Sequence, residues 1–174
     1  SGILAFGAYV PATRLQPSAI HATNAWFGGG LRGLASGEKA IANWDEDSVT
    51  MAVEAARDAL EGIDRSAVQR VAIASTTLPF ADRQNAGIVK EALNLPDAVG
   101  AIDIAGSQRA ATSALLAALG GNENTLVTAP EIMTPKPASE REMTSGDAAA
   151  SIFVGTGTPI ATLVARHSVT VDFV

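Results

Sequence analysis

Residues 103–112 read DIAGSQRAAT, a run in which an apolar strand passes through small residues directly into a helix. The hydrophobic pattern predicts a strand over residues 99–104 and a helix over residues 109–119. A side chain on such a turn lies near the positive end of the helix dipole, where backbone N–H groups can stabilise an anion or a developing oxyanion. From spacing alone, a plain connection between strand and helix explains the run as well as a functional site does.

Strands and helices alternate on both sides of this turn. The expected strands cover residues 3–10, 68–75, 99–104, 125–129, 148–154, 160–165 and 168–174. The expected helices cover residues 17–25, 47–60, 84–93 and 109–119, and a glycine-rich loop covers 27–37. Such alternation predicts right-handed crossovers and an α/β fold, with a mixed, mainly parallel sheet flanked by helices. The last three strands are joined by short turns, so we expect them to pair antiparallel.

The helix over residues 47–60 has the clearest pattern, because its apolar residues recur on one face of a 3.6-residue period. The acidic run Asp-Glu-Asp at residues 45–47 precedes its first turn, where such side chains cap a helix and complement its dipole. Gly62 follows its last turn. We therefore expect the acidic run to cap the helix rather than to bind a cation.

Composition excludes several classes of protein. The 174 residues fit one domain able to bury a core, and no stretch of about 18 uncharged apolar residues or secretory leader pattern occurs. The 18 acidic and 12 basic side chains give a formal net charge of −6, which argues against nucleic-acid binding. The absence of cysteine excludes disulfides, thiolate metal sites and cysteine nucleophiles from this chain. We expect a cytoplasmic protein that binds neither nucleic acid nor membrane.

The remaining motifs have simple structural explanations. Residues 28–33 match the glycine spacing of a dinucleotide-binding loop, but no apolar strand precedes them, so we expect a flexible loop. His21 and His167 lack partners at metal-binding spacing, and no G-x-S-x-G elbow accompanies them. The Gly-Asp pair at residues 146–147 leads into a strand and is a weak signal. The alternating run at 168–174 has no polar tail, which favours a fragment of a longer protein.

Six segments resemble, in order and spacing, the thiolase superfamily, and most closely its bacterial and archaeal hydroxymethylglutaryl-CoA synthase-like branch, which is related to ketoacyl synthase III. They are GILAFGAYVPATRL (2–15), GEKAIANWDEDSVTMAVEAARDAL (37–60), PFADRQNAGIVKEALNLP (79–96), DIAGSQRAATSALLAAL (103–119), KPASEREMTSGDAAASIFVG (136–155) and HSVTVDFV (167–174). The resemblance implies two similar halves packed in a five-layer α-β-α-β-α fold. Residues 1–174 match the N-terminal half. The C-terminal half, which in the family supplies the catalytic histidine and usually an asparagine, is absent from this chain.

The resemblance also implies a catalytic site, and the chain departs from the family at two positions there. The nucleophilic cysteine of the family aligns with Gln108, and an amide cannot form an acyl-enzyme. The general-base glutamate of the family aligns with Thr76, a poor base at neutral pH that has no evident activator in the sequence. Ser107 and Arg109 are expected beside Gln108 as further site residues.

Coenzyme A carries phosphates, and phosphates need positive charge nearby. For substrate binding we expect Arg109, Arg32 and Lys39 to contribute. Further loop cations with the same potential are Arg83, Lys136 and Arg141, although each of these is also explained as a solvated surface charge.

Three functions fit these features. The first is a thiolase-like enzyme that acts on acyl-CoA or acyl-carrier thioesters without an acyl-cysteine intermediate, such as a decarboxylase or a C–C lyase. In it, Gln108 and neighbouring N–H groups would hold the thioester carbonyl or enolate. Glutamine at this position also resembles the chain-initiating ketosynthases that decarboxylate malonyl thioesters. The second is a non-catalytic homologue that stabilises or positions a partner subunit. The third is an unrelated α/β small-molecule binder.

The half-fold that the resemblance implies also predicts partners. Half of a two-half fold leaves an apolar face uncovered, so we expect a C-terminal half, a second subunit or a symmetric copy to cover it. The expected assembly is a dimer or another homo- or hetero-oligomer, and family relatives also point to an OB-fold partner. No covalently bound cofactor or metal is implied, and coenzyme A enters as part of the substrate.

Overall fold

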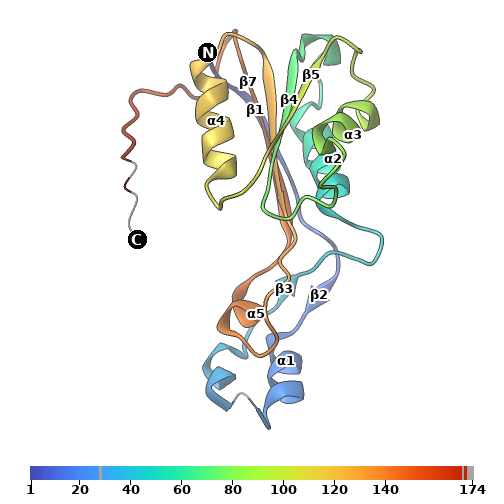
Figure 1. Cartoon of the computed structure of the whole chain (residues 1–174), viewed down its shortest axis with the longest axis vertical. Coiled ribbons are helices and arrows are strands. Elements are labelled where there is room, and N and C mark those ends of the chain that lie inside the picture. The colour runs from blue at the N-terminus through green and yellow to red at the C-terminus, as the bar shows by residue number, and fades with distance from the viewer. Residues whose placement is uncertain (28, 170, 172–174) are drawn as a thin grey trace.

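A five-stranded sheet lies at the centre of the molecule, with helices on both of its faces (Figure 1). The computed structural model describes residues 1–27, 29–169 and 171. The sheet contains β1 (Gly2–Tyr9), β4 (Arg70–Ala74), β5 (Gly100–Ile104), β6 (Thr125–Glu131) and β7 (Ala148–Gly155). Helices α2 (Ser48–Ala59) and α3 (Asn85–Ala92) cover one face, and α4 (Ala110–Gly120) covers the other. The expected α/β class is therefore confirmed.

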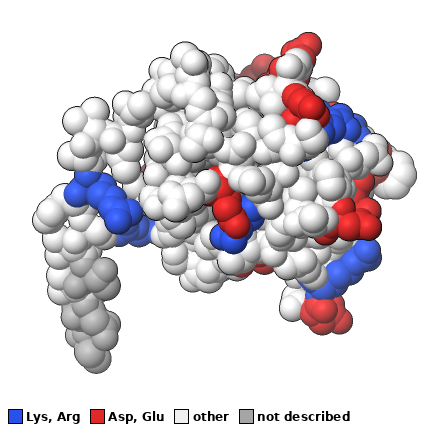
Figure 2. Space-filling model, turned by 90° about the horizontal axis from the view of Figure 1, so that it is seen from above, with Lys and Arg blue, Asp and Glu red and all other residues white. Residues whose placement is uncertain are grey.

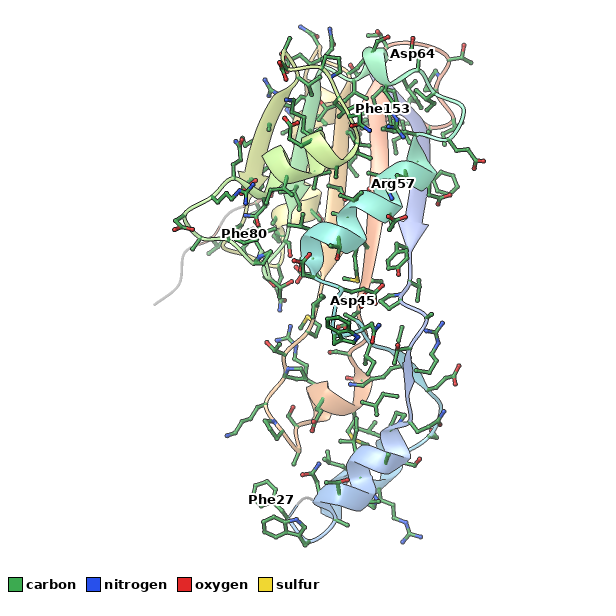
Figure 3. The ribbon with its side chains drawn as sticks, turned by 90° about the vertical axis from the view of Figure 1, so that its right-hand side faces the viewer. Phe27, Asp45, Arg57, Asp64, Phe80 and Phe153 are labelled. Carbon is green, nitrogen blue, oxygen red and sulfur yellow. The ribbon has the colours of Figure 1, made fainter. Side chains whose placement is uncertain are left out.

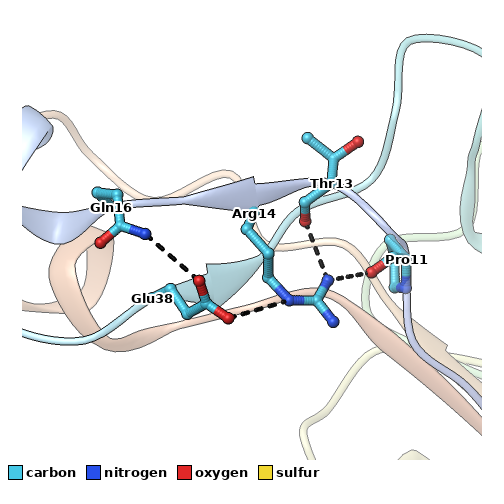
Figure 4. Close-up of polar contacts among 5 residues, drawn as sticks. All are labelled: Pro11, Thr13, Arg14, Gln16 and Glu38. Atoms are coloured by element: carbon cyan, nitrogen blue, oxygen red, sulfur yellow. Dashed lines mark hydrogen bonds and ion pairs between the residues drawn. The ribbon is translucent and has the colours of Figure 1, made fainter.

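A smaller lower part extends from one end of the sheet (Figure 1). It contains α1 (Pro17–Asn24), α5 (Glu140–Thr144), the 3-10 helix η1 (Gly29–Leu34) and a ribbon of β2 (Arg14–Leu15) and β3 (Lys39–Ala40). A second 3-10 helix, η2 (Arg65–Ala67), leads into β4. In the ribbon, Arg14 Nε lies 3.7 Å from Glu38 Oε1, and the guanidinium also donates to the carbonyls of Pro11 and Thr13 (Figure 4).

The strand order is β1-β7-β6-β4-β5. β4 pairs parallel with β5 and β6, whereas β7 pairs antiparallel with β6 and β1. Helix α3 connects β4 to β5 and helix α4 connects β5 to β6, as parallel strands require. Within the described sheet, β7 alone runs against the other strands, so the sheet is mixed and mainly parallel, as expected.

Alternate residues of β4 face opposite helical layers, as the pleat of a strand requires. Val71 and Ile73 pack into the core that contains α2 and α3. Ala72 and Ala74 pack against α4. Coverage on both faces explains why the sequence of this strand is an almost continuous apolar run.

Helix α2 begins with the cap that the sequence predicts. The carboxylate of Asp47 accepts a hydrogen bond from the Thr50 N–H at 2.7 Å, and the Asp47 N–H donates to the Thr50 hydroxyl at 2.7 Å. This reciprocal pair satisfies N–H groups that the first turn leaves without partners. Asp45 lies exposed just before the cap (Figure 3).

Asp147 connects the lower part of the molecule to the sheet through hydrogen bonds. Its buried carboxylate accepts hydrogen bonds from the N–H groups of Ala42 at 2.8 Å and Met133 at 2.9 Å. Its own N–H donates to the carbonyl of Ala40 at 3.0 Å. The Gly-Asp pair that was a weak signal in the sequence therefore has a structural role.

The strands expected near the end of the chain are not formed in the described residues. Within 160–165, Ala161 makes only an isolated bridge to Ile3. Val164 is 95% exposed, so the apolar alternation has no sheet surface to pack on, and a pattern alone does not make a strand. The described part of 168–174 also has no strand, and the rest of that run lies outside the described residues. Antiparallel pairing occurs instead where β7 meets β1 and β6.

Strand β6 is longer than the sequence predicts, because it continues beyond residue 129 through Pro130 to Glu131. Strand β4 pairs with β6 only as far as Thr128. At Pro130, β6 therefore pairs on one side only, with β7, and proline is tolerated at such a position. The extension places Glu131 at the end of a strand rather than in a loop.

Candidate functional site

The carboxyl ends of β4, β5 and β6 lie at one edge of the sheet because these strands are parallel. The loop after β4 leads to α3 on one face, and the loop after β5 leads to α4 on the other. Adjacent strands with connections toward opposite faces open a crevice at this edge, where open α/β sheets bind ligands. Ala74 and Ile104 pair in register, so the segments that carry Thr76 and Gln108 leave the sheet side by side.

Gln108 lies exposed on the turn between β5 and α4. Gly106 has a φ of 91°, a backbone conformation that favours glycine. Ser107 holds the turn, because its hydroxyl accepts a hydrogen bond from the Arg109 N–H at 3.2 Å and its carbonyl accepts one from the Ala110 N–H at 3.0 Å. Arg109 is at the cap position of α4 and provides no side-chain cap. Gln108 therefore lies at the positive end of α4, outside any closed core.

Thr76 lies two residues after the end of β4 and is hydrogen-bonded to a carboxylate that the sequence did not indicate. Glu131, the last residue of β6, accepts hydrogen bonds from the Thr76 N–H at 2.7 Å and from the Thr76 hydroxyl at 3.0 Å. The Thr77 hydroxyl donates to the same carboxylate at 3.0 Å. No sequence pattern pointed to Glu131, because its partners lie 54 and 55 residues away in the chain.

A polar network surrounds this carboxylate and borders a depression. The Ser48 hydroxyl, at the start of α2, donates to the Thr77 carbonyl at 2.8 Å and lies 2.9 Å from the Thr77 hydroxyl. The adjoining depression has a volume of about 470 Å³ and is lined by Glu46, Asp47, Ser48, Thr76, Thr77, Leu78, Ile132 and Thr134. Gln108 does not line this depression, so Thr76 and Gln108 share an edge of the sheet but not one pocket of the described chain.

Arg32 and Lys39, which were expected to bind substrate together with Arg109, lie in the lower part of the molecule. Lys39 is half-buried, and its ammonium donates to the carbonyl of Glu142 in α5. Arg32 lies in η1, which packs against α1 and α5 (Figure 1). Arg83 lies in the loop after β4, and its guanidinium lies 5.7 Å from the centre of the Phe80 ring. Phe80 itself is labelled in Figure 3. Of the expected loop cations, Arg83 and Lys136 lie on segments that leave the carboxyl edge, after β4 and β6.

Tyr9, at the end of β1, places a titratable group beside the depression. Its hydroxyl donates a short hydrogen bond to Glu46 Oε1, and Glu46 Oε2 accepts one from the Asn43 N–H at 2.7 Å. The hydrogen bond to Glu46 raises the pKa of Tyr9 above its ordinary value, and desolvation and nearby carboxylates add to this effect. The protonated phenol is therefore the favoured form.

The other motifs do not form sites in the described part of the chain. His21 lies in α1 and His167 in the exposed final segment, and no described group of three or more His, Asp or Glu side chains could hold a metal ion. Residues 29–34 form a 3-10 helix after α1, without a preceding strand, so the glycine run is not a dinucleotide-binding loop. No described helix has the length and apolar character needed to cross a bilayer.

Comparison with known proteins identifies sequence relatives, although no protein-family model matches the chain. A hydroxymethylglutaryl-CoA synthase of Aeropyrum pernix is 32% identical over 162 residues, which cover 89% of this chain and 45% of the synthase. One of Pyrobaculum aerophilum is 30% identical over 181 residues, which cover 98% of this chain and 51% of the synthase. The chain thus spans about half the length of the curated relatives it matches.

Solved structures share the fold. PksG, a hydroxymethylglutaryl-CoA synthase from Bacillus subtilis, has a TM-score of 0.79 at 19% identity, over 90% of this chain and 40% of PksG. β-Ketoacyl-[acyl carrier protein] synthase III from Thermus thermophilus has a TM-score of 0.71 at 24% identity, over 90% of this chain and 51% of the synthase. A hydroxymethylglutaryl-CoA synthase complexed with CoA has a TM-score of 0.75 at 20% identity, over 88% of this chain and 41% of that one.

Together, these findings define a thiolase-like α/β protein, and they exclude an unrelated α/β binder. More closely, the chain is hydroxymethylglutaryl-CoA synthase-like in sequence, and its fold is shared with those synthases and with ketoacyl synthase III. The resemblance inferred from the sequence is therefore confirmed at this level.

Proposed function

We propose that residues 1–174 are the N-terminal half of a thiolase-like enzyme that acts on acyl-CoA or acyl-carrier thioesters. The observation that carries the proposal is the position of Gln108, which lies exposed at the carboxyl edge of the sheet and at the positive end of α4. Donors at a helix terminus stabilise negative charge that develops on an oxygen. The relatives include a synthase complexed with CoA, which supports coenzyme A as part of the substrate.

The proposed chemistry forms or breaks a C–C bond without an acyl-cysteine intermediate. The chain contains no cysteine, and an amide is not a nucleophile for acyl transfer. The Gln108 amide can instead donate a hydrogen bond to the thioester oxygen or to an enolate. Ser107 holds the turn in place, and the exposed Arg109 can contribute positive charge toward a phosphate.

A non-catalytic homologue that positions a partner subunit is the second candidate, and the loss of the family nucleophile favours it. The exposure of Gln108 favours the enzyme, because a residue kept only for packing would be buried. Binding of a thioester separates the two candidates. The cytoplasmic location stays a prediction.

We also propose that a C-terminal half or a second subunit covers α4. Ala110, Ala114 and Ala118 pack on the sheet, while Leu116 and Ala117 lie on the other side of this uncharged helix. Thr112 and Ser113 are exposed polar residues of this helix, but it has no charged side chain and carries apolar residues on both sides, as is typical of a covered helix. Grooves of about 200 and 240 Å³ flank α4. Seen from above, most of the visible charged side chains lie on the side of the molecule away from the C-terminal segment (Figure 2). An OB-fold protein is proposed as a further partner of the whole assembly.

A cysteine introduced at Gln108 tests the proposed site, because the chain has no other thiol. Gln108→Cys in the native complex should become acylated by acetyl-CoA and gain one acetyl group in intact-mass analysis, since a thiol at a helix N-terminus has a lowered pKa. Ser66→Cys, at an exposed position outside α4, is the control and should remain unmodified. Equal labelling of both variants, or labelling of neither together with no thioester binding by the wild type, would contradict the proposal.

A further inference from the structure

The geometry points to a proton relay at the carboxyl edge, in which Thr76 takes a proton from the substrate and passes its own hydroxyl proton to Glu131. This inference rests on the proposed function, because it requires a thioester at this edge. It assigns a role to Glu131, which the resemblance does not mark, and it supplies the activator that Thr76 lacks in the sequence.

Two hydrogen bonds hold Thr76 in one orientation. Its N–H donates to Glu131 Oε1 at 2.7 Å and its hydroxyl donates to Glu131 Oε2 at 3.0 Å. Because the hydroxyl proton is directed at the carboxylate, the lone pairs of Thr76 Oγ1 are directed away from it. Thr76 is exposed and lines the depression, so a bound molecule can donate a proton to these lone pairs.

The proton acceptor is also fixed in position. The Thr77 hydroxyl donates to Glu131 Oε2 at 3.0 Å, and the Thr77 oxygen accepts a hydrogen bond from the Ile132 N–H at 3.1 Å. The Ser48 hydroxyl lies 2.9 Å from the same oxygen. These contacts join the ends of β4 and β6 to the first turn of α2, so the carboxylate is attached to rigid elements rather than to a mobile loop.

The proposed step balances within the two residues and the substrate. The C–H bond at the α-carbon of the acyl group breaks, and its electron pair moves into the thioester to give an enolate. The proton bonds to Thr76 Oγ1 while the original hydroxyl proton bonds to Glu131 Oε2. Thr76 ends neutral, Glu131 ends as a carboxylic acid, and the negative charge has moved to the enolate. A threonine hydroxyl alone is a poor base, and the carboxylate behind it removes this obstacle.

The test measures exchange of the α-protons of acetyl-CoA in deuterium oxide by mass spectrometry, with the native complex that contains this chain. Thr76→Val and Glu131→Gln should each lower the exchange rate constant by about 100-fold or more, the usual range for a general base. Thr76→Ser retains the hydroxyl and should stay within about tenfold of the wild type on the same scale. Glu61→Gln, at an exposed carboxylate after α2, is the control and should exchange at the wild-type rate.

Calorimetric binding of acetyl-CoA, measured in parallel, separates the two proposals. The relay is supported if the Thr76→Val and Glu131→Gln variants bind acetyl-CoA normally but lose exchange. It is overturned, with the proposed function intact, if the wild type binds without exchange or if Glu131→Gln exchanges at the wild-type rate. If the wild-type protein does not bind acetyl-CoA, both the relay and the proposed function are overturned. If Glu131→Gln fails to fold, the exchange rates of Thr76→Val and Thr76→Ser are compared instead. Equal exchange rates for these two variants would overturn the relay.

Discussion

Gly7 allows β1 and α2 to approach each other closely. A Cβ atom at this buried position would lie 2.6 Å from the carbonyl oxygen of Ala55 and 2.8 Å from the Cα of Ala59. Both are backbone atoms, so neither can rotate out of the way. Close approach at this point lets α2 contact β1, β6 and β7 together, and so places Ser48 and Asp47 at the carboxyl edge.

Gly7→Ala should therefore lower the free energy of unfolding by at least about 2 kcal/mol, because overpacking against backbone forces the helix away from the sheet. Urea denaturation measures the change. Gly30→Ala is the control, since a Cβ there would meet no atom within 4 Å. A Gly7→Ala variant as stable as Gly30→Ala would mean that α2 can shift without cost.

The Tyr9–Glu46 hydrogen bond predicts a pH dependence. The folded pKa of Tyr9 is raised, so the interaction stabilises the fold below the unfolded pKa of about 10 and is lost as the pH rises through the folded value. Tyr9 is the single tyrosine of the chain, so its ultraviolet titration reports this group alone. We expect a midpoint above that of a free tyrosine, and Glu46→Ala should return it toward the free value. Glu61→Ala is the control, and an unchanged midpoint in Glu46→Ala would refute the assignment.

Helix α3 illustrates an element that depends on a residue of another element. Asp103 in β5 accepts three hydrogen bonds, from the N–H and side-chain amide of Asn85 at 2.8 Å each and from the Ala86 N–H at 2.7 Å. The cap residue Gln84 makes no side-chain cap of its own. The carboxylate therefore caps α3 from the neighbouring strand and fixes the connection from Thr76 to this helix.

Asp103→Ala should lower the free energy of unfolding by about 2 kcal/mol, because it removes a cap and leaves the buried amide of Asn85 without that partner. Thermal unfolding followed by circular dichroism measures the loss. Asp82→Ala, in the exposed loop before α3, should change the midpoint little. If the two variants melt together, Asp103 does not cap α3.

Local sequence patterns predicted helices and strands, but they did not predict contacts between residues far apart in the chain. The period of α2, its Asp47 cap and the apolar run of β4 are visible in short windows, and each is found. Residues 160–165 have the same kind of local pattern, but the described chain provides no surface for them to pack on. Gln108 could be placed from the turn sequence and the resemblance, whereas Glu131 could not, because its role depends on β4 and β6 lying side by side.

At the scale of the whole molecule, the carboxyl edge and α4 meet at the same surface. Gln108 leads into α4, and the helix presents Leu116 and Ala117 away from the sheet. Ile102 of β5 is 43% exposed although it is apolar, and the groove that it borders is also lined by Arg70 and Thr125, at the starts of β4 and β6, so this groove lies toward the opposite edge of the sheet from Gln108. A polypeptide that covers α4 along its whole length would also reach the turn that carries Gln108, and exclusion of water strengthens electrostatic stabilisation there. We therefore expect covering of α4 and completion of the site to be coupled in the proposed assembly.

A charge on the outer side of α4 tests this coupling. Ala117→Glu should leave the chain folded, because the residue is exposed, but it should release the covering polypeptide, since burial of an unpaired carboxylate is costly. Native mass spectrometry of the purified complex measures the loss of the second polypeptide, and acetyl-CoA binding should fall with it. Ala22→Glu introduces the same charge at an exposed helical alanine of α1 and should keep the complex intact. An Ala117→Glu complex that retains its second polypeptide would show that the partner binds elsewhere.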